Sequence, residues 1–452
     1  MKRILIFGLL ALSLNDVCGK EETEWKEVLL YGIDTEVLQV LEQIRSSKDA
    51  SLNNELVDVL KQTVSNDVKI AILGYFTDVN EEKGQQTAVD ILTNYEDTNE
   101  KLIISVLRYL SMLESTESLP LFEELVTHPE IGVASAALRG LGRILDSSGN
   151  SSRSLPPDYS RESVEVFLLE KFKSRDLDEA LRPEIILTLG KIGGELSVER
   201  LLEIVRDRQE EKLLRLYATD SLGKIADPKA IPALRELYLE NDSLIRAYAA
   251  SALAEFDTAE VMDILMQGLK DSSWRVRETS AKGLANPRSA EAMDILIYKA
   301  RKDPVRNVRV EAIKALGEIG RKKSLDFLRE MYEDEAQRLD IRIASFDVLV
   351  KKDLNATLPS VEKILEQELA KPAYQAKVLE HTGKSLDGIE NSSLKKIFQR
   401  MLDAADPIVR IHGIRGIATN RFEDLKDRLQ SISENESHGA VKREAQTALS
   451  KW

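Results

Sequence analysis

Side chains that could bind a metal or perform catalysis are few in this sequence. The chain has four histidines and a single cysteine, Cys18. The histidines are His128, His381, His412 and His438. The residues that follow them are Pro, Thr, Gly and Gly, so none begins an H-E or H-x-x-x-H motif. Metal sites need several such ligands at short spacings. The sequence therefore predicts no metal, no cofactor and no catalytic set.

Arginine is the charged residue with a regular spacing. It occurs in VRVEAIKALGEIG (308–320), and related strings lie at 214–226, 245–257 and 409–421. When copies are aligned on this arginine, twelve anchor positions appear at intervals of 31 to 35 residues, except for one interval of 48. The arginines are Arg182, Arg215, Arg246, Arg277, Arg309, Arg342 and Arg410, and the other anchors are Lys69, Ile103, Ala134, Gln375 and Lys442. Such a period is the signature of a repeat protein.

The positions after each anchor predict the element that holds it. The third residue is small or apolar in every copy, and the seventh is apolar in eleven of twelve. These offsets trace one stripe of an α-helix. A second amphipathic stretch lies between successive anchors, as in IPALRELYLEND (231–242). Each unit is therefore expected to be a hairpin of two helices, and stacked hairpins share the core that one hairpin lacks.

Composition agrees with a helical chain and limits its partners. The chain is 43% hydrophobic, 5% aromatic and 31% charged, and its formal net charge is −14. Few aromatic residues and many charged ones are typical of long helices with thin aliphatic cores. A net negative charge disfavours binding to nucleic acid and to anionic membranes. We expect neither as a partner.

The clearest copies resemble a known repeat. The pattern Ala-Asp-Pro-x-Ala-Ile-Pro-x-Leu at 226–234, followed by Asp242, Arg246 and Ala249, is similar to HEAT repeats of the short bacterial type, also called phycobilin-lyase HEAT-like. The similarity is strong over 178–320, fair over 321–452 and weak before 130. It implies an all-α fold, a right-handed α-α superhelix of about twelve helical hairpins, with the second helices on the concave face. One enzyme family of this fold, deoxyhypusine hydroxylase, uses His-Glu pairs that this chain lacks.

The repeated arginine has a structural and a functional interpretation. Each arginine could bridge to a carboxylate or a turn carbonyl of the neighbouring hairpin, since guanidinium groups bind carboxylates through two hydrogen bonds. The HEAT resemblance implies such a ladder, and Asp178, Asp242 and Asp406 are the carboxylates expected in it, each four residues before an arginine. The alternative is a row of free arginines that binds an acidic partner. We favour the ladder.

The first residues differ in kind from the rest. Lys2 and Arg3 precede an apolar run over 4–14, and Val17 and Gly19 offer small residues around Cys18. This pattern predicts a signal peptide over 1–19, too short to be a membrane span, and hence an exported, periplasmic protein. Two outcomes stay open: release after cleavage, or a lipid anchor at Cys18. No later stretch is apolar enough to predict a transmembrane segment.

The repeats divide the rest of the chain. We expect a helical cap or weak repeat over 20–66, HEAT repeats over 67–145 and 163–452, and a cap at the C-terminus that includes Trp452. The long interval contains DSSGNSSRSLPPDYSRE, which predicts a Ser/Pro-rich loop insertion over 146–162. This loop is either a tolerated insertion or a functional one.

A solenoid without a catalytic set favours a non-catalytic scaffold that binds a protein or peptide, in bacterial envelope assembly or maintenance. Aromatic side chains dominate many protein interfaces. The candidate binding residues are Tyr217, Tyr248, Trp274 and Glu311, near the anchors of the best copies. The alternative is a lyase-like enzyme, or an enzyme subunit, that uses the arc to hold a substrate.

Overall fold

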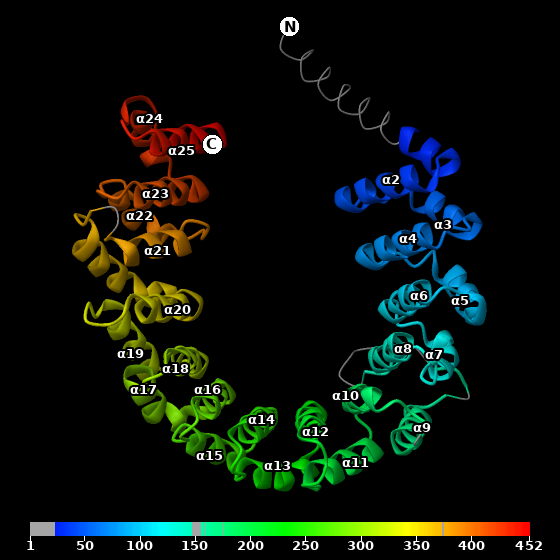
Figure 1. Ribbon diagram of the computed structural model, residues 1–452. Helices are drawn as coiled ribbons and strands as arrows, with labels where there is room; N and C mark the ends of the chain where they lie inside the picture. Colours follow the sequence, from blue (N-terminus) through cyan, green and yellow to red (C-terminus); the bar gives the residue numbers. More distant parts are fainter. Residues whose placement is uncertain (1–22, 147–154, 158, 175, 373–374) are drawn as a thin grey trace. The chain divides into compact units, whose positions relative to one another are not determined.

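Every regular element is a helix in the part of the chain that the computed structural model describes (Figure 1). The described residues are 23–146, 155–157, 159–174, 176–372 and 375–452. The predicted signal peptide, with Cys18, and residues 147–154 and 158 of the predicted loop lie outside them. The chain divides into two compact units, Met1–Ala233 and Leu234–Trp452.

The first unit consists of helical hairpins in two layers. The second helices of successive hairpins pack on one another in chain order, and the first helices form the other layer. The second-helix layer comprises α2 (Asp34–Ser47), α4 (Asn66–Val79), α6 (Glu100–Met112), α8 (Ile131–Ile144), α10 (Arg182–Ile192) and α12 (Lys212–Ile225). The first helices are α3 (Asn53–Gln62), α5 (Gln85–Thr93), α7 (Leu119–Leu125), α9 (Arg161–Lys173) and α11 (Glu195–Arg206).

The second unit repeats this arrangement, and Figure 1 shows α14, α16 and α18 side by side in one layer. Its second helices are α14 (Ser243–Leu253), α16 (Trp274–Gly283), α18 (Arg306–Ile319), the start of α20 (Leu339–Glu368), α21 (Lys377–Leu386), α23 (Pro407–Asn420) and α25 (Gly439–Ser450). Its first helices are α15 (Ala259–Gly268), α17 (Met293–Lys302), α19 (Lys322–Glu333), the end of α20, α22 (Lys395–Met401) and α24 (Lys426–Asn435), while α13 (Ile231–Tyr238) spans the boundary between the units.

The anchor positions coincide with the second helices. Eleven of the twelve lie inside these helices, and Gln375 lies two residues before α21. Seven first or second helices are preceded by a short 3-10 turn: Tyr95–Asp97, Thr116–Ser118, Glu179–Leu181, Pro228–Ala230, Ser289–Ala292, Ser392–Leu394 and Glu423–Leu425. In the segment expected to be a cap, α2 packs against α4 as one more member of the second-helix layer.

Small residues allow the second helices to approach closely. A Cβ added at Gly190 of α10 would collide with the side chain of Ser221 on α12, and one added at Gly317 of α18 would collide with Val348 on α20. These glycines follow the anchors by eight residues, on the face that meets the next hairpin. The narrow buried face expected from the sequence is therefore a direct helix-to-helix contact.

Two hairpins of the second unit are joined without a loop. Helix α20 is 30 residues long and bends at Asp353, where φ is −160° and ψ is 57°. Its first part packs against α18 and α19, and the whole helix also contacts α21 and α22. The first part is thus the second helix of one hairpin, and the last part is the first helix of the next.

The described end of the loop insertion is attached to the first unit. The Tyr159 hydroxyl donates a hydrogen bond to Glu123 on α7, and the Arg161 side chain donates to the carbonyl of Leu145 at 3.3 Å. Burial, together with the Glu123 carboxylate, raises the pKa of Tyr159. Helix α9 already begins at Arg161, capped by the Ser160 hydroxyl, so the loop ends before residue 162.

The C-terminal tryptophan lies against the last hairpin. The Trp452 indole N–H donates to Glu423 at 2.9 Å, and the Lys426 ammonium lies 5.3 Å from the centre of the ring.

Candidate partner-binding surface

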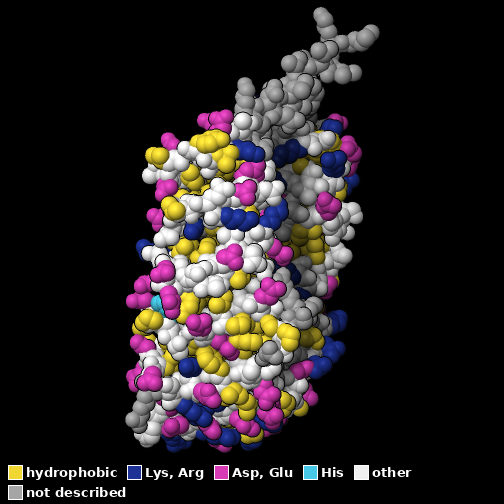
Figure 2. Space-filling model, turned by 90° about the vertical axis from the view of Figure 1, so that its right-hand side faces the viewer, with side chains coloured by type: hydrophobic (Ala, Val, Ile, Leu, Met, Phe, Trp, Pro, Cys, Tyr) yellow, Lys and Arg dark blue, Asp and Glu magenta, His cyan; other side chains and the backbone are white. Residues whose placement is uncertain are grey.

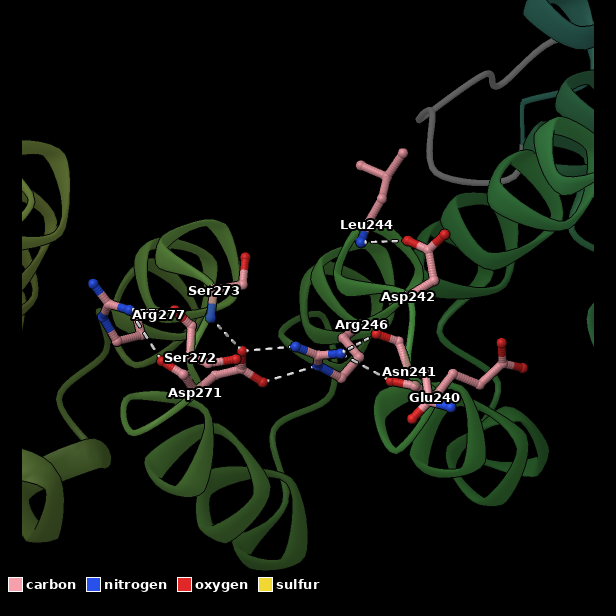
Figure 3. Close-up of polar contacts among 9 residues, drawn as sticks. All are labelled: Glu240, Asn241, Asp242, Leu244, Arg246, Asp271, Ser272, Ser273 and Arg277. Carbon is pink, nitrogen blue, oxygen red and sulfur yellow. Dashed lines mark hydrogen bonds and ion pairs between the residues drawn. The ribbon is translucent and has the colours of Figure 1, made fainter.

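The anchor arginines lie in the second helices, close to the turn that joins the two helices of each hairpin. Arg246 on α14 forms two hydrogen bonds with the Asp271 carboxylate of the next hairpin, both at 2.9 Å. Its remaining nitrogen donates to the carbonyls of Glu240 and Asn241 in its own turn, at 2.9 and 2.8 Å (Figure 3). Those carbonyls would otherwise lack a helical partner. One arginine therefore holds its own turn and also the next hairpin.

Arg277 on α16 repeats the arrangement one hairpin later. It binds the Asp303 carboxylate at 2.8 and 2.9 Å. It also donates to the carbonyls of Asp271 and Ser272 (Figure 3). This pair is the more buried of the two, with side-chain exposures of 8% for Arg277 and 0% for Asp303. Lys299 also lies 3.3 Å from Asp303. Asp271 thus joins two successive arginines, one through its carboxylate and the other through its carbonyl.

Hydrogen bonds keep these aspartates ionised. Burial alone would raise the pKa of Asp271, but the side chain of Arg246 and the N–H of Ser273 outweigh burial and hold that pKa below its usual value. The pKa of Asp303 is lowered in the same way, against burial, chiefly by Arg277.

Four other anchor arginines bind a carboxylate of the next hairpin, a carbonyl of their own hairpin, or both. Arg410 binds Glu436 at 2.7 Å, and Arg182 lies 3.4 Å from Glu210 and 4.6 Å from the centre of the Phe172 ring. Arg215 donates to the carbonyl of Val205. Arg342 donates to the carbonyl of Tyr332 at 2.8 Å and lies 3.8 Å from the buried carboxylate of Glu368.

The carboxylates of this ladder differ from those expected. Asp271, Asp303 and Glu436 each lie six residues before the next anchor, whereas the expected aspartates lie four residues before it. Asp178, Asp242 and Asp406 are helix caps that accept the N–H groups of Ala180, Leu244 and Ile408, each at 2.8 Å. The register differs because a position four residues before the anchor is the start of the helix, where free N–H groups need an acceptor.

Arg309 on α18 stands outside the ladder. Its side chain forms no hydrogen bond or ion pair with a described residue, and its Nε is buried without a partner. The position six residues before the next anchor is Ala336, which has no carboxylate to offer. The carboxylate of Asp334, two residues earlier, accepts from Ala336 and Gln337.

The four residues expected to bind a partner are half-buried. Tyr217 lies on α12 of the first unit, and Tyr248, Trp274 and Glu311 lie on α14, α16 and α18 of the second. The Trp274 ring stacks on the Arg275 guanidinium at 4.7 Å, and Glu311 pairs with Lys314 at 2.6 Å. The structure therefore places three of them on successive second helices and Tyr217 in the other unit.

The exposed side of the second-helix layer also carries ion pairs between hairpins that the sequence analysis missed. In the second unit these pairs are Arg306–Asp340, Lys352–Glu318 and Arg415–Glu444, and a hydrogen bond of 2.6 Å joins His381 to Asp347. In the first unit, Arg108, Arg139, Arg143 and Lys191 line one hollow. The signal was available, because most of these residues lie five or nine positions after an anchor.

Metal-ligating side chains and membrane-spanning helices were sought among the described residues. No group of three or more His, Cys, Asp or Glu side chains there is arranged to hold a metal ion. None of the described helices has both the length and the apolar character that crossing a membrane requires. On the face that Figure 2 presents, hydrophobic side chains are interspersed with acidic and basic ones.

Comparison with known proteins identifies the repeat. The sequence matches the family described as spirochaete HEAT repeat protein over residues 29–448. No curated protein sequence matches the chain.

Among solved structures, the chain is similar to Kap95 in a Kap95:Nup1 complex, with 14% identity, a TM-score of 0.56, and coverage of 94% of this chain and 66% of that one. Kap95p with RanGDP gives 13% identity, a TM-score of 0.49 and the same coverage. Human deoxyhypusine hydroxylase gives 16% identity and a TM-score of 0.25, over 62% of this chain and 98% of that one. The chain spans about two thirds of the Kap95 chains, and these similarities concern the fold alone.

Proposed function

The chain belongs to the spirochaete HEAT repeat protein family, and we propose that it is an exported, non-catalytic scaffold that binds a protein partner along its second-helix layer. The observation that carries this proposal is the continuity of that layer within each unit. Successive second helices pack directly on one another and expose a row of charged and half-buried aromatic side chains. An α-solenoid offers such an extended surface for another protein.

The ladder supports the proposal by accounting for most of the anchor arginines. Arg246 and Arg277 have their hydrogen-bonding groups occupied by carboxylates and turn carbonyls, so they hold hairpins together. The surface left for a partner is the exposed side of the same helices, where Tyr248 and Trp274 lie half-buried. Export follows from the pattern of the first 19 residues, and we propose the bacterial envelope as the place of action.

The test is capture of the partner in cells. The full chain is expressed in a bacterium with a cell envelope, cross-linked lightly and purified, and the species that accompany it are identified by mass spectrometry. A variant with Tyr248→Glu and Glu311→Lys provides the comparison, after circular dichroism has verified its helical content. One envelope protein that accompanies the wild type and is lost from the folded variant is the expected result. A small molecule or metal ion in place of a protein would refute the scaffold and favour a lyase-like enzyme.

A further inference from the structure

A hollow of about 510 Å³ on the second helices of the first unit gathers basic side chains in an otherwise acidic protein. Arg108 comes from α6, Arg139 and Arg143 come from α8, and Lys191 comes from α10. Asp146 is the one acid in the lining, and small or apolar residues such as Ala136 complete it. The chain as a whole has a formal net charge of −14. A local gathering of cations against that background needs an explanation.

Two of these cations have no counterion among the described residues. Arg108 and Arg143 are exposed, and neither side chain forms a hydrogen bond or an ion pair with a described residue. Arg139 lies 3.5 Å from Glu184 and donates to the hydroxyl of Ser135 at 3.0 Å. Two complete guanidinium groups are therefore available at the hollow, and each can bind a carboxylate through two parallel hydrogen bonds.

Some other cations on the exposed side of second helices are paired with an acid of a neighbouring hairpin. In the second unit, Arg415 binds Glu444 through two hydrogen bonds of 2.9 Å, and Lys352 lies 2.6 Å from Glu318 of the preceding hairpin. Arg108 and Arg143 have no ion pair with a described residue, so their guanidinium groups can bind the carboxylates of another molecule.

Two of the cations also repel each other. Arg139 and Arg143 are four residues apart on α8, where like charges repel. A bound anion would relieve this repulsion, and a concave surface lined mainly by one sign of charge attracts ligands of the opposite sign.

We propose that this hollow binds an acidic segment of the protein partner, with Arg108 and Arg143 each engaging a carboxylate. This inference rests on the proposed scaffold function and names the chemistry of its partner. A peptide is favoured over nucleic acid because Glu184 and Asp146 lie at the same hollow and the chain is acidic overall. A long polyanion would meet these carboxylates, whereas a short acidic segment can place its side chains between them.

The test uses the full chain and a short fluorescein-labelled peptide of alternating Glu and Ala, with binding measured by fluorescence anisotropy. The double variant Arg108→Glu and Arg143→Glu is expected to raise the Kd at least about tenfold. The matched control, Lys270→Glu with Lys302→Glu, changes the net charge equally at exposed positions of the second unit. It is expected to change the Kd less than about twofold. Circular dichroism verifies that both variants keep their helical content.

Each other outcome contradicts the proposal in a recognisable way. Equal losses in both double variants would mean that only net charge matters. A single-stranded oligonucleotide that binds more tightly than the peptide, with the same dependence on Arg108 and Arg143, would assign the hollow to nucleic acid instead. The peptide experiment tests whether the hollow binds acidic segments, whereas capture of the partner tests whether the protein is a scaffold. A partner retained by the folded Arg108 and Arg143 variant would refute the hollow and leave the scaffold intact.

Discussion

Arginines occur in two different settings on the second helices, and the comparison separates structure from binding. In the second unit, Arg277 is buried, binds the carboxylate of Asp303 in the next hairpin and donates to a carbonyl in its own turn. In the first unit, Arg143 is exposed, and no described residue binds its side chain. Burial and the supply of a carboxylate therefore decide what the residue does, although both arginines lie on equivalent helices. The same substitution should therefore reduce stability much more at Arg277 than at Arg143.

The largest effect is expected for Arg277→Ala. This change leaves the fully buried Asp303 carboxylate without its main partner, which costs about 3 kcal/mol of unfolding free energy. Urea unfolding followed by circular dichroism measures the loss. Arg143→Ala is the control from the other setting and should cost less than about 0.5 kcal/mol. Similar losses in the two variants would remove the distinction between them.

A smaller effect is expected for Arg246→Ala, because that ion pair is less buried, with exposures of 15% and 13%. Its loss should cost about 1.5 kcal/mol. Arg309→Ala sharpens the comparison within a single unit, since Arg309 has no carboxylate to lose, and it should cost less than about 0.5 kcal/mol. If Arg309→Ala were as damaging as Arg246→Ala, the anchor arginine would stabilise the fold through its aliphatic part and not through the ladder.

Acid should weaken the ladder and leave the hollow almost unchanged. Because the folded protein lowers the pKa of Asp271 and Asp303, their contribution is present above the usual carboxyl pKa of about 4 and is lost as the pH falls through the lowered values. The urea concentration at the unfolding midpoint should therefore decrease as the pH is lowered below about 4. The stability lost on acidification should be smaller than the loss in the arginine variants, because burial offsets part of the stabilisation that the ionised aspartates provide. Asp271→Asn with Asp303→Asn should flatten this pH dependence, and an unchanged slope would contradict the assignment.

The smallest effect is expected for Arg143→Glu. The change replaces the repulsion with Arg139 by an attraction, but it also places a negative charge in the last turn of α8, where a positive one is favourable, so the two effects should offset to within about 0.5 kcal/mol. The same change should weaken binding of the acidic peptide. A thermal melt alongside the anisotropy measurement tests both parts, and a loss of stability above about 1 kcal/mol would show that Arg143 has a structural role.

Much of this fold could be predicted from the sequence. The offsets after each anchor predict helices because buried residues recur with the helical period, and eleven anchors do lie in second helices. The HEAT architecture is confirmed by the family match. The junction at Asp353 could not be predicted, since a helix that bends without a loop carries no Gly or Pro signal at that position.

The site was less accessible to sequence reasoning. The ladder was expected, but its carboxylates were assigned to the helix-capping aspartates, because Asp242 and Asp271 look equally suitable until the turn geometry is known. The basic hollow depends on three helices meeting, and periodicity along a single helix does not report that contact. The ladder carboxylates and the basic hollow both depend on which neighbouring hairpin a side chain faces, and the sequence alone does not give that information.

The ladder has a direction, since the arginines that bind a carboxylate reach forward to the following hairpin. Any hairpin that carries both an anchor arginine and an aspartate six residues before it, such as the one with Asp271 and Arg277, contains both halves of an interface. A duplicated copy of that segment would therefore fit against itself and against both neighbours. A gene encoding such a chain can gain or lose whole hairpins without requiring a new kind of contact, because each hairpin contacts only its neighbours.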